Sequence, residues 1–377
     1  MMKFNFKTVS LLVAVILLTS FNQAEANKEY TKVIHKEFSI DPEGEVSLEN
    51  RRGTVEVVSW DQPSVEIEVT ITVEARNEDD ANEVFDKIDI NFSDNGQSVS
   101  ATTEVETSNK KRSWWNWSWH GKNKIDYSVD YKVKMPKTCD LDLEHSYGHA
   151  TVTDLLADAV IELKYGDLKM GKIGGDLDLE LGYGEAKVNE ASKVDAEIWY
   201  SEFTITSLDK LDIESRYSDI SVDYADEVDS ESQYDHYSIG QAEDFKSNGR
   251  YDDIEIERVN NLNVESHYSD YILGHLSQSA DLQMEYGDAK IKRLVDGFNR
   301  VKLKGNHVDF KIFPDEDASY MLNIESVYTH VEYPKQILRS NIDREGAKLE
   351  FDGIIGRDGD TQSEIRADTY YGQLIID

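Results

Sequence analysis

Apolar and polar residues alternate along most of the chain, in short stretches that meet at a tyrosine. In one such stretch, Leu211 and Ile213 lie six and four positions before Tyr217, with acidic residues between them. Apolar residues return three and five positions after the tyrosine, at Ile220 and Val222. A period of two on both sides of a corner indicates two short strands that each bury one face.

These corners recur at a nearly constant interval of 17 or 18 residues. The tyrosines of this column are Tyr147, Tyr165, Tyr183, Tyr200, Tyr217, Tyr234, Tyr251, Tyr268 and Tyr286. Stacked units of this kind bury a continuous core that no single unit can bury. The repeat therefore predicts an all-β chain, a β-solenoid with roughly a dozen rungs spaced about 4.8 Å apart. A propeller blade needs roughly 40 to 45 residues, so the interval excludes that fold.

Residues 59–136 interrupt the repeat. Val65 to Val73 and Ile125 to Val133 alternate as strands do, and Glu78 to Phe85 begins with acidic residues, which favours a short helix. We expect a β-rich N-terminal capping subdomain over 27–136, which includes a first rung and a tryptophan-rich loop. Such a cap shields the open edge of the stack. The solenoid repeats are expected over 137–377.

The first 26 residues have the features of a signal peptide. Lys3 and Lys7 precede an apolar run from Val9 to Leu18. The small residues Ala24 and Ala26 occupy the two positions that signal peptidase recognises. The apolar run is shorter than the roughly 20 residues that a membrane span requires. We expect cleavage after residue 26 and a secreted mature chain without a transmembrane segment, in the periplasm or at the cell surface.

Composition and charge exclude several classes of protein. The chain has 40 Lys plus Arg against 75 Asp plus Glu, a net charge of −35, which is incompatible with a phosphate-binding footprint and excludes nucleic acid as a partner. At 39% hydrophobic and 10% aromatic residues, it is too apolar for a disordered acidic polymer. Cys139 is the sole cysteine, so there is no internal disulfide, and no His/Cys cluster has the spacing of a structural zinc site.

Three features together resemble the putative-adhesin family of exported bacterial β-strand-repeat proteins, also described as toastrack-like. They are the unit Gly53-Thr54-Val55-Glu56-Val57, the strand-rich insertion that closes with Lys134-Met135-Pro136, and the serial repeats of Leu-x-Leu-Glu-x-x-Tyr-Gly-Asp. The resemblance covers nearly all of the mature chain. It implies stacked β-rungs and an adhesive or envelope-associated role, and it carries over no catalytic residues. This chain departs from the family's usual Asn-Gly-Asp turn by placing tyrosine at the corner.

The tyrosine column falls in phase with the inward leucines, so we expect it to form a structural ladder of stacked rings. Offset stacking adds about 0.5 to 1.5 kcal/mol per neighbouring pair. The alternative is an exposed aromatic track for sugar rings, which requires the corner to turn the rings outward. Several of these tyrosines are followed by glycine, which suits a tight or left-handed backbone at the corner. These glycines are Gly148, Gly166, Gly184 and Gly287.

Carboxylates form columns in the same frame, three residues before the tyrosine and two residues after it. Neighbouring carboxylates about 4.8 Å apart repel by roughly 1 kcal/mol in water and a few times that near a protein surface. We therefore expect compensation by adjacent Lys and Arg, by hydration and screening, or by a shared cation. Solvated ladders are favoured and no cofactor is expected. The alternative is weak calcium binding, with Asp219, Asp253 and Asp270 as candidate ligands.

The segment 110–124 is basic and aromatic in an otherwise acidic protein. It contains four of the six tryptophans, Trp114, Trp115, Trp117 and Trp119. Such a loop suits docking to an envelope protein, stacking on glycans or contact with an anionic membrane surface. The alternative is that it packs on the acidic flank of the solenoid.

Candidate catalytic residues are not apparent. The nine histidines are scattered over different repeats, and abundant carboxylates give no reason to single out a catalytic pair. We expect an exported, non-enzymatic envelope or cell-surface solenoid with a structural, adhesin-like or interaction role. The alternatives are an envelope-stress or signalling partner that docks through the tryptophan-rich loop, and a carbohydrate-active β-helix enzyme.

Overall fold

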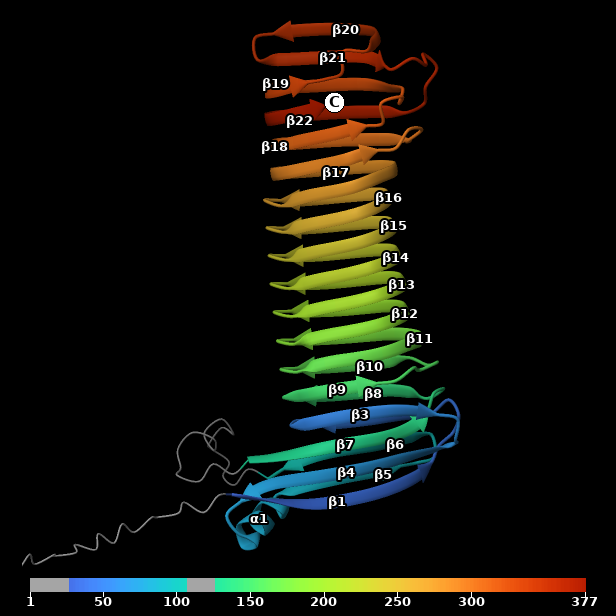
Figure 1. Cartoon of the computed structure of the whole chain (residues 1–377), viewed down its shortest axis with the longest axis vertical. Coiled ribbons are helices and arrows are strands. Elements are labelled where there is room, and N and C mark those ends of the chain that lie inside the picture. The colour runs from blue at the N-terminus through green and yellow to red at the C-terminus, as the bar shows by residue number, and fades with distance from the viewer. Residues whose placement is uncertain (1–26, 107–125) are drawn as a thin grey trace, which may run out of the picture.

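The computed structural model describes residues 27–106 and 126–377 as a long rod of stacked strands on a broader base (Figure 1). Strands make up 77% of the described residues and form a β-solenoid of about 10 turns with rungs of about 18 residues. The all-β solenoid predicted from the repeat is confirmed, with fewer turns than the dozen expected. No helix in the described ranges is long and apolar enough to cross a membrane.

From β11 to β16, each rung of the rod is one long strand that starts just after one tyrosine corner and ends just before the next. The strands of the rod are β8 (Asp140–Ser146), β9 (Gly148–Val152), β10 (Ala159–Lys164), β11 (Asp167–Gly182), β12 (Glu185–Trp199), β13 (Glu202–Arg216), β14 (Asp219–Gln233), β15 (His236–Arg250), β16 (Asp253–His267), β17 (Asp270–Leu294) and β18 (Arg300–Pro314). Neighbouring strands are parallel and in register, so Leu211 lies between Val194 and Val228.

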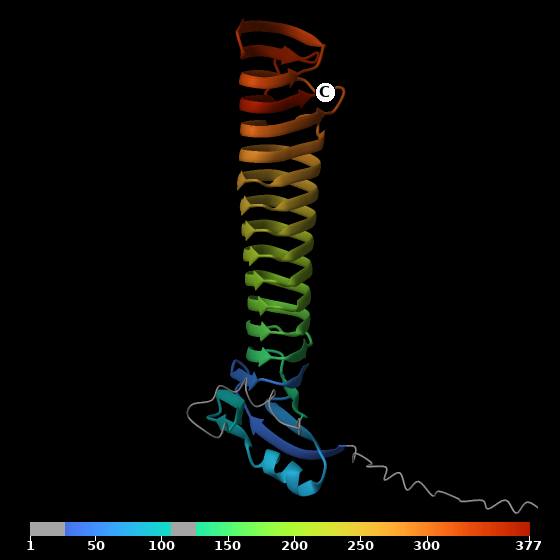
Figure 2. The same ribbon diagram turned by 90° about the vertical axis from the view of Figure 1, so that its left-hand side faces the viewer.

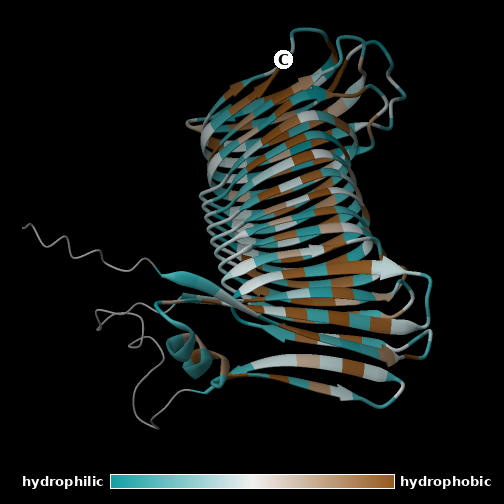
Figure 3. Cartoon of the chain, turned by 60° about the horizontal axis from the view of Figure 1, so that its bottom comes forward, coloured by the Kyte–Doolittle hydropathy of each residue, from teal (hydrophilic) through white to brown (hydrophobic). Residues whose placement is uncertain are grey.

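The core is a set of apolar columns inside the coil. Leu211 and Ile213 are fully buried, while Asp212 and Glu214 between them are exposed. Figure 3 shows this alternation as brown hydrophobic segments that recur from rung to rung. The period-two pattern of the sequence therefore identified the inward face of each strand correctly.

At the base, the two faces of the coil continue as two separate sheets. One face runs through β3 (Gly53–Trp60), β7 (Asp126–Pro136), β4 (Ser64–Ala75) and β1 (Lys28–Ser39). The other runs through β2 (Glu45–Asn50), β6 (Ser98–Val105) and β5 (Ile88–Asp94). The predicted strand at 65–73 is confirmed as part of β4, and the described part of the predicted strand at 125–133, residues 126–133, is confirmed as part of β7.

The predicted helix is present as α1 (Glu78–Phe85), capped by the Asn77 side chain, which accepts a hydrogen bond from the Asp80 amide. It packs chiefly against β4 and buries Ala81 and Val84. Figure 2 shows α1 at the far end of the base, away from the rungs. The division into subdomains at residue 136 stays a prediction.

At the opposite end, the strand order departs from the chain order. β22 (Glu364–Ile376) lies between β18 and β19 (Tyr320–Glu332), parallel to both. β21 (Lys348–Ile355) and β20 (Ile337–Glu345) extend the stack beyond β19 as an antiparallel pair. The exposed outermost strand β20 carries Arg339, Asp343 and Arg344, and charges on an edge strand discourage pairing with another chain.

Replacing Leu211 and Ile213 together by Asp should destabilise the rod by several kcal/mol, because two unpaired carboxylates would enter a dry core. The matched control is Asp212→Asn with Glu214→Gln, which changes exposed residues of the same strand and should shift the free energy of unfolding by less than about 0.5 kcal/mol. Denaturant unfolding followed by circular dichroism measures both. A wild-type midpoint in the double-Asp variant would contradict the inward assignment.

Candidate functional site

The tyrosine corners adopt a backbone conformation that is unfavourable for L-residues. Every non-glycine residue with positive φ in the described ranges belongs to this column, with φ between +52° and +62°. The column comprises the nine tyrosines identified from the repeat and, in the upper rungs, His307, Tyr328 and Tyr371. A non-glycine residue held in this region costs on the order of 1–3 kcal/mol.

The glycines after the tyrosines have a different role from the one expected. Only Gly287 among the four has positive φ, so the expectation of a left-handed backbone is wrong for Gly148, Gly166 and Gly184. These three lie against the backbone of the neighbouring rung instead. A Cβ atom on Gly166 would lie 1.7 Å from the carbonyl oxygen of Gly148. Glycine is required there for close approach of two rungs.

The rings point outward, so the expectation that they lie in phase with the inward leucines is wrong. Tyr217 is 49% exposed and the residue before it, Arg216, is exposed as well. The next residue, Ser218, is buried. Two consecutive exposed residues break the period of two, because the left-handed residue reverses the alternation at each corner.

The outward rings nevertheless stack on one another as a ladder along the rod. From Tyr147 to Tyr286, consecutive ring centroids lie 4.7 to 5.1 Å apart with interplanar angles of 1° to 9°. His307 continues the ladder at 4.9 Å, and Tyr371 and Tyr328 follow at 4.7 and 5.3 Å. The predicted stacking is confirmed. We call this column the tyrosine ladder.

Stacking decides what the tyrosine ladder presents to solvent. Each interior ring has a neighbour on both faces, so its edge and its phenol hydroxyl are the parts that face outward. A sugar ring therefore cannot stack on these faces, as the aromatic track would require. Stacking is worth about 0.5–1.5 kcal/mol per pair, which is comparable with the backbone strain and offsets much of it. The backbone amides are satisfied as well, since the Tyr217 amide donates to the Gln233 carbonyl at 3.1 Å.

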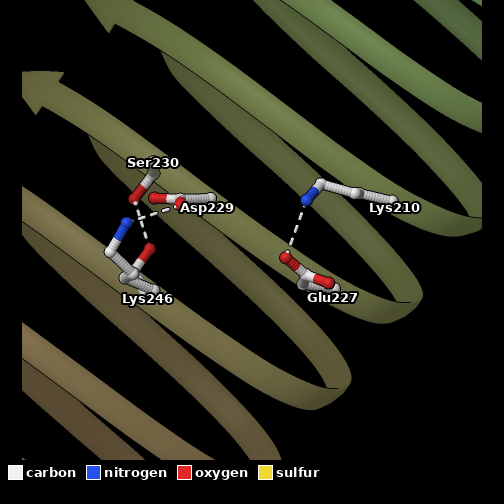
Figure 4. Close-up of polar contacts among 5 residues, drawn as sticks. All are labelled: Lys210, Glu227, Asp229, Ser230 and Lys246. Carbon is white, nitrogen blue, oxygen red and sulfur yellow. Dashed lines mark hydrogen bonds and ion pairs between the residues drawn. The ribbon is translucent and has the colours of Figure 1, made fainter.

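The carboxylate columns flank the tyrosine ladder as predicted, and basic residues compensate part of their repulsion. Lys246 occupies the position that Asp229 has one rung earlier, and the two form an ion pair at 2.6 Å. Lys210 binds Glu227 at 2.8 Å in the same way (Figure 4). The hydrogen bond that Lys246 donates to the Asp229 carboxylate raises the pKa of Lys246. Both of these carboxylates lie further from the tyrosine than the two predicted columns. Within the glutamate column, compensation is confirmed at Lys164, which contacts Glu162 and Glu180 at 2.5 and 3.0 Å.

The three calcium candidates are not three neighbours in one column. His236 lies between Asp219 and Asp253 in register, whereas Asp253 and Asp270 are adjacent. One oxygen of Asp270 accepts a hydrogen bond from the Asp288 amide at 2.8 Å. Over 27–106 and 126–377, no group of three potential metal ligands comes together. Calcium binding there stays a prediction.

Two sequence-based predictions fall on residues that the structure does not describe. The expected signal peptide covers 1–26, and the tryptophan-rich loop with Trp114, Trp115, Trp117 and Trp119 falls within 107–125. Both predictions therefore lie outside the described residues.

Sequence reasoning missed a pair of buried carboxylates inside the corners. Asp235 and Asp252 follow their tyrosines directly and are 4% and 2% exposed. Asp252 accepts hydrogen bonds from the Asp235 amide and the Ser232 hydroxyl, both at 2.9 Å. Burial raises the pKa of Asp252 to about 6 and also raises that of Asp235. The signal was Tyr-Asp at these two corners, whereas the other seven corners from Tyr147 to Tyr286 have Tyr-Gly or Tyr-Ser.

Comparisons with known proteins give only distant likenesses. No family model matches the chain, and no curated protein matches it. A solved structure described as a putative cell adhesion protein from Clostridium sporogenes has 9% identity and a TM-score of 0.17, covering 93% of this chain and 98% of that one.

Two further solved structures come from Parabacteroides. One is described as a putative adhesin from Parabacteroides merdae, with 14% identity, a TM-score of 0.26 and coverage of 75% of this chain and 93% of that one. The other is described as a putative lipid binding protein from Parabacteroides distasonis, with 12% identity, a TM-score of 0.27 and coverage of 74% and 96%. The stacked β-rungs implied by the sequence resemblance are present in this chain, and its function is argued from its own residues.

Substitutions at Tyr217 should separate ring stacking from backbone strain. Tyr217→Phe keeps both stacking contacts and should leave the free energy of unfolding nearly unchanged. Tyr217→Ala keeps the strained φ and loses both contacts, so it should cost about 1–3 kcal/mol. Tyr217→Gly should fall between them, because glycine relieves the strain. Tyr224→Ala, at an exposed tyrosine outside the tyrosine ladder, is the control. Equal stability of the Ala and Phe variants would contradict the stabilising role of stacking.

The buried Asp252 should make stability fall as the pH rises. Its folded pKa, about 6, lies above the ordinary 3.8, so the folded state holds the proton more tightly. The stabilisation of the folded state that comes from this tighter proton binding is complete below pH 3.8 and is lost as the pH rises through 6. The free energy of unfolding of Asp252→Asn, relative to that of wild type, should rise by roughly 1–3 kcal/mol between pH 4 and pH 7 and stay constant above pH 7. Urea unfolding across this range measures the difference, and a flat difference would contradict the raised pKa.

Proposed function

We propose that the protein is an exported, non-enzymatic, adhesin-like rod that contacts its target through the outward edge of the tyrosine ladder. The observation that carries this proposal is the ladder itself, a continuous outward column of rings, each held in a strained backbone conformation. Strain of this kind concentrates at functional positions. Glycine would make the same corner without strain, so core formation alone does not require tyrosine there.

The stacked rings favour binding because they are already ordered. A ring such as Tyr217, held on both faces by Tyr200 and Tyr234, has little rotamer freedom left to lose on contact. Each phenol hydroxyl both donates and accepts hydrogen bonds. Regularly spaced weak contacts along one rigid rod add up through multivalency. The tyrosine ladder therefore suits an extended, hydroxyl-rich or amide-rich target.

Charge narrows the class of target. The tyrosine ladder is flanked by exposed carboxylates such as Glu202, Asp219 and Asp253. The whole chain has a formal net charge of −35. This face would repel an anionic membrane surface. A neutral glycan or an envelope protein with basic or neutral groups fits better. The likeness to the putative-adhesin family agrees with a role outside the cytoplasm, and the features of 1–26 support export.

The experiment removes three neighbouring phenol hydroxyls while keeping the rings. The mature chain with Tyr200→Phe, Tyr217→Phe and Tyr234→Phe is compared with wild type for retention on immobilised neutral polysaccharides and on isolated bacterial envelopes. At about 0.5–1.5 kcal/mol per lost hydrogen bond, the variant should bind at least about tenfold more weakly.

A matched control removes three hydroxyls from the outer face of the same rungs. Thr204, Ser221 and Ser238 lie in one column in register, away from the corners. Thr204→Val with Ser221→Ala and Ser238→Ala should bind as wild type does. Failure of the wild type to bind any of these surfaces would refute the adhesive function. Equal binding by the Phe variant would refute the tyrosine ladder as its contact surface.

A further inference from the structure

A groove of about 430 Å³ lies beside the upper part of the tyrosine ladder. Its walls come from four rungs that are consecutive in space. They are residues 265–267 in β16, 283–285 in β17, 304–306 in β18, and Asp368, Tyr370 and Tyr371 in β22. The volume is within the range of small-ligand sites. β22 reaches this position because it lies between β18 and β19.

The groove differs from the same strip of surface lower on the rod. There, Lys164 binds Glu162 and Glu180 at 2.5 and 3.0 Å and lies 5.7 Å from the centre of the Trp199 ring, so that side chains cover the surface. In the groove, Lys304 occupies the glutamate column between Gln283 and Asp368. Lys304 makes no ion pair within the part of the chain that the structure describes.

Tyr370 gives the groove an aromatic wall with an unstacked ring. It is 49% exposed and aligns in register with Asn306 and Val327, neither of which has an aromatic ring. Among the described residues no ring stacks on it. Its neighbour Tyr371, in contrast, lies between His307 and Tyr328 and has both faces covered. The aromatic face that the tyrosine ladder cannot offer is therefore available at Tyr370.

We propose that this groove binds one or two units of a neutral saccharide. Tyr370 stacks on the apolar face of a sugar ring, while Gln283, Lys304 and Asp368 exchange hydrogen bonds with its hydroxyls. Glu265, Glu285 and Asp368 outnumber the one lysine, and His267 is engaged with Glu285 at 3.3 Å. The net negative charge excludes acidic sugars. The inference rests on the proposed adhesive function and specifies the class of glycan.

Calorimetric titration of the mature chain with cellohexaose, chitohexaose and mannohexaose tests the proposal, with hexagalacturonate as the acidic counterpart. We expect at least one neutral oligosaccharide to bind and hexagalacturonate not to bind. Tyr370→Ala should weaken binding at least tenfold, and Gln283→Leu should weaken it severalfold. Tyr224→Ala, at an exposed tyrosine away from the groove, is the matched control and should bind as wild type does. Melting temperatures verify that each variant is folded.

The outcomes separate this inference from the proposed function. If no neutral oligosaccharide binds, or if both groove variants bind as tightly as wild type, the saccharide groove is refuted. The adhesive function survives that result when the triple Phe variant of the tyrosine ladder still loses retention on surfaces. Binding of hexalysine in place of the sugars would also refute the inference, because it would assign the groove to basic peptides.

Discussion

Parallel, in-register pairing of successive rungs is the constraint on which the rest of the structure depends. It places each side chain directly over its counterpart 17 or 18 residues away, at the spacing of hydrogen-bonded strands. A residue type that recurs at one position of the repeat therefore forms a column along the rod. Apolar residues become continuous columns of core, and tyrosines become a stack of rings. Carboxylates face one another and need neighbours such as Lys246 to reduce their repulsion.

The same constraint explains how a strained residue can be tolerated at every turn. A lone tyrosine with positive φ would lower stability, whereas a tyrosine between two others gains stacking on both faces. Strain and stacking therefore belong to a cooperative array rather than to single residues. Inside the corners, the buried residues Asp235 and Asp252 are also stabilised by groups from neighbouring rungs. Each buried carboxylate is held by hydroxyls and amides, such as Ser232 on β14 and the Asp235 amide, that in-register pairing brings beside it.

The sequence predicted the solenoid, its register and its inward columns because period two and a fixed repeat length are direct consequences of stacked strands. It did not predict that the Tyr217 ring points outward. Tyrosine is not typical of left-handed backbone, so the left-handed conformation was assigned to the glycines that follow several of the tyrosines. It also missed the groove. Repeat logic places β19 directly after β18, so nothing in the pattern brings Tyr370 beside Lys304.

The position of β22 has a consequence for the order in which the rod is completed. Rungs up to β18 can be added one after another in chain order, each templated on the rung before it. The next place in the stack belongs to residues 364–376, which follow β19, β20 and β21 in the chain. Growth from one end therefore has to pause at β18. The last turns must assemble together, so this end of the rod closes only once residues 364–376 can pair with both β18 and β19.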